Sequence, residues 1–229
     1  MGTLIVLEGL DGSGKGTQTE LLRRHLEEKN IKVRVVDFPD YSSDGCALVK
    51  MYLAGKLGDD PNATNAYAAS MFFAADRYVS YVTSWKADYA GDTVIIANRY
   101  TTANAYHQLS KMPRENWDDF LEWLWDFEFC KLGLPKPDRV MLLDMPESVS
   151  SALVRRRSAE TGQKLDIHEK HEDYLLKCRK AAAYTAKKCA WHIIPCADEE
   201  EDVPYPIEKI AEMIAQDADE LLESKKAET

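Results

Sequence analysis

The chain has 229 residues, of which 45% are hydrophobic and 30% are charged, the composition of an ordinary globular protein. Its net charge of −10 argues against a nucleic-acid binder, because such proteins usually carry a basic excess. Its five cysteines form no Cys-x-x-Cys pair, which argues against a disulfide framework or zinc site and favours a reducing cytoplasm. No apolar run approaches the roughly 20 residues that cross a membrane.

Strand and helix patterns alternate along the chain. The predicted strands cover 3–9, 31–39, 93–99, 137–146 and 191–196. The predicted helices cover 17–30, 44–56, 63–88, 113–130, 147–157, 166–189 and 206–224, with a polar loop over 158–166. This alternation is typical of an α/β fold in which helices cover both faces of a parallel sheet. We therefore predict a single domain over 1–229.

The stretch "EGLDGSGKGTQ", residues 8–18, joins the first strand to the first helix. Its glycines would let backbone N–H groups converge on phosphate oxygens, and the helix N-terminus adds partial positive charge. Lys15 would reach the β- and γ-phosphates of a nucleotide. An ordinary glycine-rich turn is the alternative, but the strand before and the helix after favour a phosphate-binding loop. The predicted ATP-binding residues are Gly9, Gly12, Ser13, Gly14, Lys15, Gly16 and Thr17.

Magnesium is the expected cofactor, although the loop departs from the usual pattern. Gly16 stands where a Ser or Thr hydroxyl would ligate the ion, and Thr17 could instead cap the helix or bind the α-phosphate. We expect Mg²⁺ to be held mainly by nucleotide phosphates and water, with no direct protein ligand. His168 and His171 have no further ligand at a recognisable spacing, so we predict a polar helix start there.

The loop resembles that of adenylate kinases and other nucleoside monophosphate kinases, and further segments resemble the thymidylate kinase family. Asp11 lies inside the loop, as it does in that family. The other similar segments are "DFP" (37–39), "FFAADR" (72–77), "ANRYTTANAYHQ" (97–108), "LDMPE" (143–147) and "DIHE" (166–169). Each is weak alone, but together they span most of the chain in the family's order. The resemblance implies a three-layer P-loop NTPase fold with a five-stranded parallel sheet, a small lid near 155–166, and a homodimer formed through helices such as 63–88.

The resemblance also implies how an acceptor nucleotide is bound. Phe73 and Arg77 share one helix face, where the ring would stack on a pyrimidine and the guanidinium would bond its carbonyl. Arg99 would bind the acceptor phosphate, and Asp11 would accept a hydrogen bond from the sugar 3′-hydroxyl. A core position for Phe73 and a surface ion pair for Arg99 are the alternatives. The other implied substrate-binding residues are Phe38, Tyr100 and Gln108.

Catalysis would need cations near the transferred phosphoryl group. Family members whose loop lacks a basic residue after the aspartate carry catalytic arginines in the lid, and that loop residue here is Gly12. The "RRR" at 155–157 would supply them, although a charge run is also typical of a solvated face. The implied catalytic residues are Lys15, Arg99, Arg155 and Arg157.

The implied reaction is the ATP-dependent phosphorylation of dTMP to dTDP. The acceptor needs no general base, because the second pKa of a phosphate monoester is about 6. Asn98, Ala103 and His107 stand where the family usually has Asp, Ser, and Tyr or Phe, so the base specificity is less constrained than the reaction type. Three alternatives stay open: a kinase acting on another nucleoside monophosphate, a nucleotide-binding homologue with weak catalysis, and a deoxynucleoside kinase with Glu8 as its base.

Overall fold

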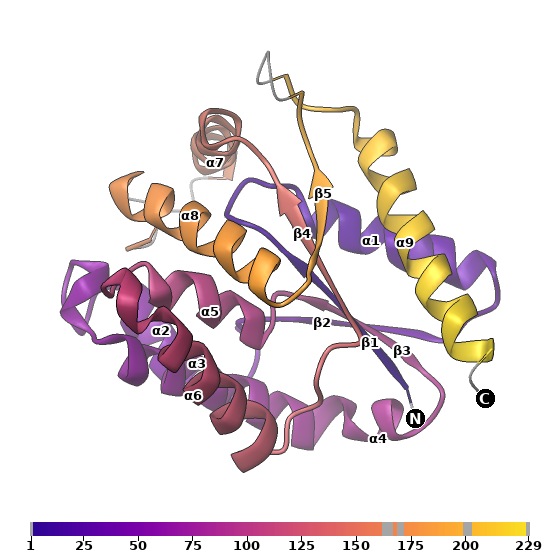
Figure 1. The fold of residues 1–229 in the computed structure, drawn as a ribbon, viewed down its shortest axis with the longest axis horizontal. Coiled ribbons are helices and arrows are strands. Elements are labelled where there is room, and N and C mark those ends of the chain that lie inside the picture. Colours follow the sequence, from indigo (N-terminus) through magenta and orange to yellow (C-terminus); the bar gives the residue numbers. More distant parts are fainter. Residues whose placement is uncertain (1, 162–166, 169–171, 199–202, 228–229) are drawn as a thin grey trace.

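The computed structural model describes residues 2–161, 167–168, 172–198 and 203–227. The strands of this part of the chain are β1 (Thr3–Glu8), β2 (Val33–Asp37), β3 (Val94–Asn98), β4 (Arg139–Asp144) and β5 (His192–Pro195). They form one sheet in the order β2-β3-β1-β4-β5, and all of the pairings are parallel (Figure 1). The predicted five-stranded parallel sheet is confirmed.

Helices surround this sheet. The α-helices within the described residues are α1 (Lys15–Glu28), α2 (Ala47–Leu53), α3 (Ala66–Ser80), α4 (Lys86–Ala90), α5 (Thr101–Leu109), α6 (Trp117–Trp125), α7 (Glu147–Thr161), α8 (Glu172–Lys188) and α9 (Ile207–Ala227). The shorter elements are the 3₁₀ turns η1 (Asp44–Cys46), η2 (Pro61–Ala63) and η4 (Arg114–Asn116) and the π-helical turns η3 (Tyr81–Trp85) and η5 (Asp126–Lys131).

The sheet is covered on both faces, which makes three layers. All six residues of β1 are buried, and successive side chains point to opposite faces. Leu4 and Val6 pack in a core with α5, α6 and α8. Ile5 and Leu7 pack in a second core with α1 and α9. Figure 1 shows the same division, with α1 and α9 on one side of the sheet and α5, α6 and α8 on the other.

The helices differ from the sequence prediction in several places. Helix α5 has no counterpart among the predicted elements, because nearly all of its residues are buried and no amphipathic pattern marks it. Helix α7 continues to Thr161, where a loop was predicted from 158, and the Arg156 Nε to Glu160 Oε1 ion pair of 2.7 Å supports its last turn. Helix α8 begins at Glu172, and residues 162–166 of the predicted lid lie outside the described residues.

Within the described residues, every helix is too short or too polar to cross a membrane.

Packing of α1 onto the sheet can be tested at Leu26, which has no exposed surface and lies in the core shared with α9. Leu26→Ala should lower the free energy of unfolding by about 2–5 kcal/mol, because it removes buried apolar surface and leaves a cavity. Urea denaturation followed by tryptophan fluorescence measures the change. Glu28→Ala, on the exposed side of the same helix, should change stability by less than about 0.5 kcal/mol. Equal effects of the two variants would contradict the described packing of α1.

Candidate active site

The phosphate-binding loop leaves β1 and enters α1 with the backbone that the sequence predicts. Gly12 and Gly14 have φ values of 81° and 84°, a left-handed conformation that favours glycine. Gly14 is the N-cap residue of α1 and offers no side chain to cap it, and the first turn of α1 has no acidic residue. The N-terminal N–H groups of α1 and their partial positive charge therefore face the loop without a competing carboxylate of the helix itself.

Lys15 and Gly12 show how tightly the loop is built. The ammonium of Lys15 donates to the carbonyl of Leu10 at 2.7 Å and to Ser13 Oγ at 3.4 Å, so the lysine is held over the loop. A Cβ added to Gly12 would lie 2.3 Å from the backbone oxygen of Ser150, in the first turns of α7. The loop thus rests directly against α7, the helix that carries Arg155.

Asp11 and Arg99 form an ion pair at the edge of the phosphate-binding loop. Arg99 follows β3, and its Nη2 lies 2.8 Å from Asp11 Oδ1, while its Nη1 donates to the hydroxyl of Tyr106 at 2.8 Å. Nη1 also lies 3.3 Å from His107 Nε2. Arg99 has a φ of 66°, a strained conformation for a residue with a side chain, and such strain clusters at functional sites.

The electrostatics of this cluster follow from burial and opposite charge. Burial alone would raise the pKa of Asp11, but Arg99 and Lys15 outweigh it and hold that pKa well below its usual value. Burial, together with the neighbouring His168 and Arg99, lowers the pKa of His107 well below its usual value. At neutral pH the cluster therefore contains a carboxylate, two cations and an uncharged imidazole.

Glu8 supports the cluster from beneath. It has no exposed surface and accepts a hydrogen bond from the backbone N–H of Tyr100 at 3.0 Å and from the Tyr106 hydroxyl at 2.8 Å. The Thr102 hydroxyl also donates to it. With these three hydrogen bonds, the Glu8 carboxylate orients the start of α5 and the hydroxyl of Tyr106, which in turn contacts Arg99. Because its oxygens already accept these bonds, Glu8 is poorly placed to act as the general base of a deoxynucleoside kinase.

Phe73 and Arg77 lie on α3 with different surroundings. Phe73 is half-buried, and its ring meets Tyr52 edge-on at 6.0 Å beside the small core that contains Ile167. Arg77 is only 2% exposed and forms a two-point ion pair with Glu128, with Nε–Oε2 and Nη2–Oε1 distances of 2.7 and 2.5 Å. Its Nη1 lies 3.4 Å from the carbonyl of Tyr100.

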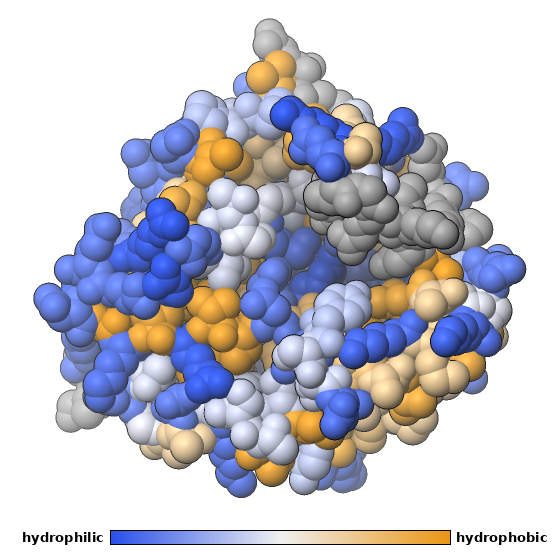
Figure 2. Space-filling model, turned by 180° about the vertical axis from the view of Figure 1, so that it is seen from behind, coloured by the Kyte–Doolittle hydropathy of each residue, from blue (hydrophilic) through white to orange (hydrophobic). Residues whose placement is uncertain are grey.

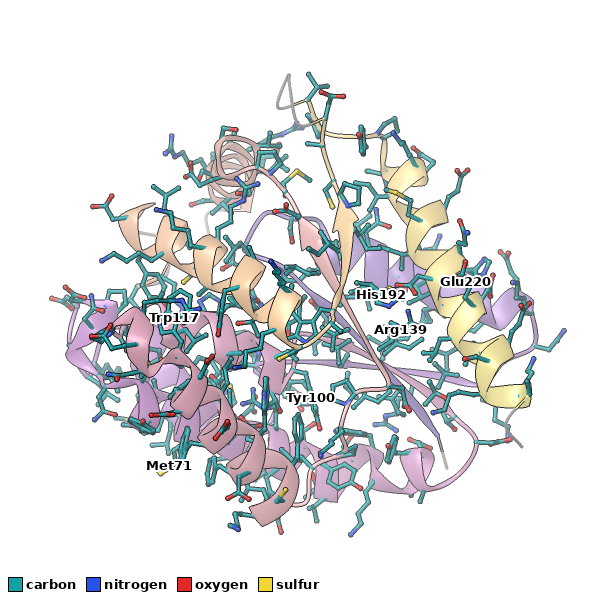
Figure 3. All side chains as sticks on the ribbon, viewed as in Figure 1. Met71, Tyr100, Trp117, Arg139, His192 and Glu220 are labelled. Carbon is teal, nitrogen blue, oxygen red and sulfur yellow. The ribbon has the colours of Figure 1, made fainter. Side chains whose placement is uncertain are left out.

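Three other predicted substrate residues point into the protein. The Tyr100 side chain lies in the core near Phe38 and Trp85 and donates to the carbonyl of Pro135 at 3.1 Å (Figure 3). Phe38 is 5% exposed in the same core. Gln108 has no exposed surface, and its amide has no hydrogen-bond partner within the described residues. Roles for these side chains in nucleotide binding stay predictions.

The predicted lid arginines lie at the end of α7. Arg155 is exposed there, and the side chain of Arg157 is outside the described part of the structure. Of the remaining loop residues, Ser13 is buried, whereas Gly16 and Thr17 are exposed at the start of α1. Figure 2, which views the face opposite to that of Figure 1, shows a hollow with strongly hydrophilic residues at its bottom.

Known proteins match this chain over most of its length. A sequence model described as "Thymidylate kinase" matches residues 7–207. The chain is 31% identical to "Thymidylate kinase" of Mycobacterium tuberculosis over 183 residues, which is 79% of this chain and 83% of that protein. It is 28% identical over 204 residues to "Probable thymidylate kinase 1" of Saccharolobus solfataricus, covering 89% and 93% of the two chains.

The chain belongs to the thymidylate kinase family.

This family membership confirms the resemblance that the ordered motifs indicated, and it directs attention to the magnesium ion that kinases use with ATP. Within the described residues, no group of three or more His, Cys, Asp or Glu side chains could hold a metal ion. Asn98 Oδ1, at the end of β3 beside β1, is buried without a hydrogen-bond partner, while its Nδ2 donates to Asp37 Oδ1 at 2.8 Å. Asn98 thus offers no carboxylate at this edge, which fits an ion held mainly by nucleotide phosphates and water.

Sequence reasoning missed two residues of this candidate site. Tyr106 joins Arg99 to Glu8, and Glu128 holds Arg77. A signal for Glu128 was present, because it follows Leu124 by four residues and Leu121 by seven and so lies on the buried face of its helix.

The close approach of Gly12 to α7 can be tested by comparing alanine substitutions at Gly12 and at Gly16. A Cβ added to Gly16 would meet no atom within 4 Å. Gly12→Ala should destabilise the protein by about 1–3 kcal/mol, because alanine is strained at this φ and its methyl meets the backbone of Ser150. Gly16→Ala should be neutral or stabilise by up to about 1 kcal/mol, because its position is helical. Thermal unfolding of both variants measures the difference, and a tolerated Gly12→Ala would be inconsistent with the close approach of α7.

Proposed function

We propose that the protein transfers the γ-phosphoryl group of ATP to the 5′-phosphate of dTMP, giving ADP and dTDP. The observation that carries this proposal is the ion pair between Asp11 and Arg99 at the edge of the phosphate-binding loop, in which Arg99 Nη2 lies 2.8 Å from Asp11 Oδ1. It sets a guanidinium suited to an acceptor phosphate beside a loop suited to the donor phosphates. Family membership supports the same reaction.

In this reaction, the residues of the site bind and align the two phosphate groups that react. Lys15 and the N-terminus of α1 bind the ATP phosphates, and Arg99 binds the acceptor phosphate and holds it in line with the γ-phosphorus. Asp11 and Tyr106 hold the Arg99 guanidinium in place before substrate arrives. The attacking phosphate oxygen is already ionised at neutral pH, so no side chain needs to remove a proton.

Further cations act on the charge that develops during transfer. Arg155 and Arg157 of α7 would stabilise the equatorial oxygens of the transferred group, and closure of the lid would exclude water. Mg²⁺, bound with ATP, would neutralise phosphate charge while being held mainly by the phosphates and water. Phe73 would stack on the thymine ring, and Arg77 would donate to one of its carbonyls.

An assay of ADP release with dTMP, dUMP, AMP, CMP and UMP tests the function. We expect the highest kcat/KM with dTMP. A preference for AMP would reject the thymidylate assignment while keeping the kinase class. Tight nucleotide binding with no ADP release would point to a binding homologue, and phosphorylation of thymidine would point to a deoxynucleoside kinase.

Lys15→Ala provides the matching variant. It should lower kcat by roughly 10²–10³-fold, because a preorganised cation at the transferred phosphoryl group is lost. Lys32→Ala, an exposed lysine at the opposite end of the sheet, should leave kcat unchanged. Circular dichroism should show that both variants fold. Near-normal turnover by Lys15→Ala would reject the loop as the donor site.

We also propose that the protein is a cytoplasmic homodimer. An apolar patch on α2, α3 and η3 supports the dimer. It consists of side chains that are 39–49% exposed: Leu48, Met51, Tyr67, Met71, Tyr78 and Val82. Met71 projects outward at the edge of the molecule in Figure 3. Patches of this kind mark interfaces, and most homodimers are formed by one self-complementary surface. The five cysteines are free, which fits a reducing compartment.

Met71→Glu should convert the dimer to a monomer, because it places a charge at the centre of an apolar interface. Light scattering coupled to gel filtration gives the mass of each species. Leu176→Glu introduces the same charge at an exposed apolar residue of α8 and should leave the dimer intact. A monomeric wild-type protein, or a dimeric Met71→Glu variant, would reject this interface.

A further inference from the structure

Glu128 is a fully buried carboxylate that the proposed reaction does not use. It lies in η5, the π-helical turn that ends the helical segment begun by α6, and it has no exposed surface. Such wide turns recur at functional sites. Besides Arg77, it contacts two groups of α5: the Thr101 hydroxyl donates to Oε2 at 2.7 Å, and Asn104 Nδ2 donates to Oε1 at 3.2 Å.

Stability alone does not account for a buried carboxylate at position 128. A buried ion pair seldom stabilises a fold more than apolar side chains of similar volume, because both charges must leave water. Leu121 and Leu124, which precede Glu128 in the same helical segment, lie in the apolar core. The contacts of Glu128 instead converge on the two helices, α3 and α5, that flank the predicted position of the acceptor base.

The Glu128 contacts fix the direction of Arg77. A guanidinium has five N–H groups. Nε and Nη2 each give one to Glu128, and Nη1 gives one to the carbonyl of Tyr100. One N–H group on Nη1 and one on Nη2 are left by these contacts. Because the two-point pair prevents rotation of the planar group, these two donors keep a set direction.

Asn104 is fixed by the same carboxylate. Its Nδ2 donates to Glu128 Oε1 and to the carbonyl of Ser70, both at 3.2 Å. The amide nitrogen is therefore held toward α3 and η5. One buried carboxylate thus sets the orientation of two polar side chains on neighbouring helices.

We propose that Glu128 is a positioning residue that sets the base specificity of the acceptor site through Arg77. This inference rests on the proposed function, in which Arg77 donates to a carbonyl of the base. A guanidinium can only donate hydrogen bonds, and the two-point pair with Glu128 keeps its remaining donors in one direction. It therefore favours a pyrimidine that presents a carbonyl at that position over one that presents an amino group. Thymine and cytosine differ in this way.

The test is Glu128→Gln, which keeps the shape of the side chain but turns one acceptor oxygen into an amide donor that faces other donors. The KM for dTMP should rise roughly 10- to 100-fold, the loss expected for a hydrogen bond to a charged group. The KM for ATP should stay unchanged, and kcat at saturating dTMP should change by less than about threefold. The ratio of kcat/KM for dTMP to that for dCMP should fall by roughly tenfold or more.

Asp217→Asn is the matched control. Asp217 is a carboxylate of low exposure, and its Oδ1 lies 2.7 Å from Nη1 of Arg139. Arg139 begins β4, at the end of the sheet opposite to the phosphate-binding loop, and is labelled in Figure 3. This variant should lower the midpoint of thermal unfolding. It should not change the KM for dTMP or the ratio of kcat/KM for dTMP to that for dCMP, called the base ratio below. If Glu128→Gln behaved in the same way, with altered stability and unaltered base ratio, Glu128 would be structural and the inference would be rejected.

A second variant covers the case in which Glu128→Gln leaves a buried unpaired charge and unfolds. Glu128→Asp keeps the charge but shortens the side chain, so it should fold while the two-point pair with Arg77 is lost and the ratio of kcat/KM for dTMP to that for dCMP falls. Retained discrimination in a folded Glu128→Asp variant would overturn the proposal. The wild type separates the two hypotheses: no phosphorylation of dTMP rejects the proposed function and this inference together, whereas normal wild-type turnover with an unchanged variant base ratio rejects the role of Glu128 alone.

Discussion

The parallel pairing of β1 with β3 determines where the charged groups of the site lie. Leu7 and Asn98 are register partners, and the N–H of Arg99 donates to the carbonyl of Leu7 at 3.0 Å. Glu8 and the phosphate-binding loop therefore leave the sheet at the same edge as Arg99. A slip of one residue would turn every buried side chain of β3 to the other face, so the two cores lock this register. The contact between Arg99 and Asp11 follows from strand pairing more than from any local motif.

The two arginine–carboxylate pairs of the site differ in exposure, and this difference matches their proposed partners. The side chains of Arg99 and Asp11 are 14% and 25% exposed, so a charged phosphate can approach without leaving water completely. The side chains of Arg77 and Glu128 are 2% and 0% exposed. A guanidinium already neutralised in this way suits an uncharged base, for which direction matters more than charge.

The sequence was sufficient to predict the elements that have a simple pattern. The five strands are short apolar runs, and the loop after β1 is defined by its glycines and Lys15, so both could be recognised. Helix α5 could not, because it is buried almost all round and shows no polar face. Tyr100 and Gln108 were predicted from motif position, but which way a side chain points depends on how α5 packs, and both point into the core. The spacing from Leu121 and Leu124 could have marked Glu128 as buried, but its pairing could not be predicted, because Arg77 lies 51 residues away in the chain.

The absence of a side chain at position 12 determines from which element a further cation can approach the phosphates. The space that a larger residue would fill is occupied by the backbone of α7 at Ser150. A basic residue at position 12 and a closely packed α7 therefore exclude each other sterically. With glycine here, a cation that approaches the phosphates from this side of the loop has to come from α7 itself, the helix that carries Arg155.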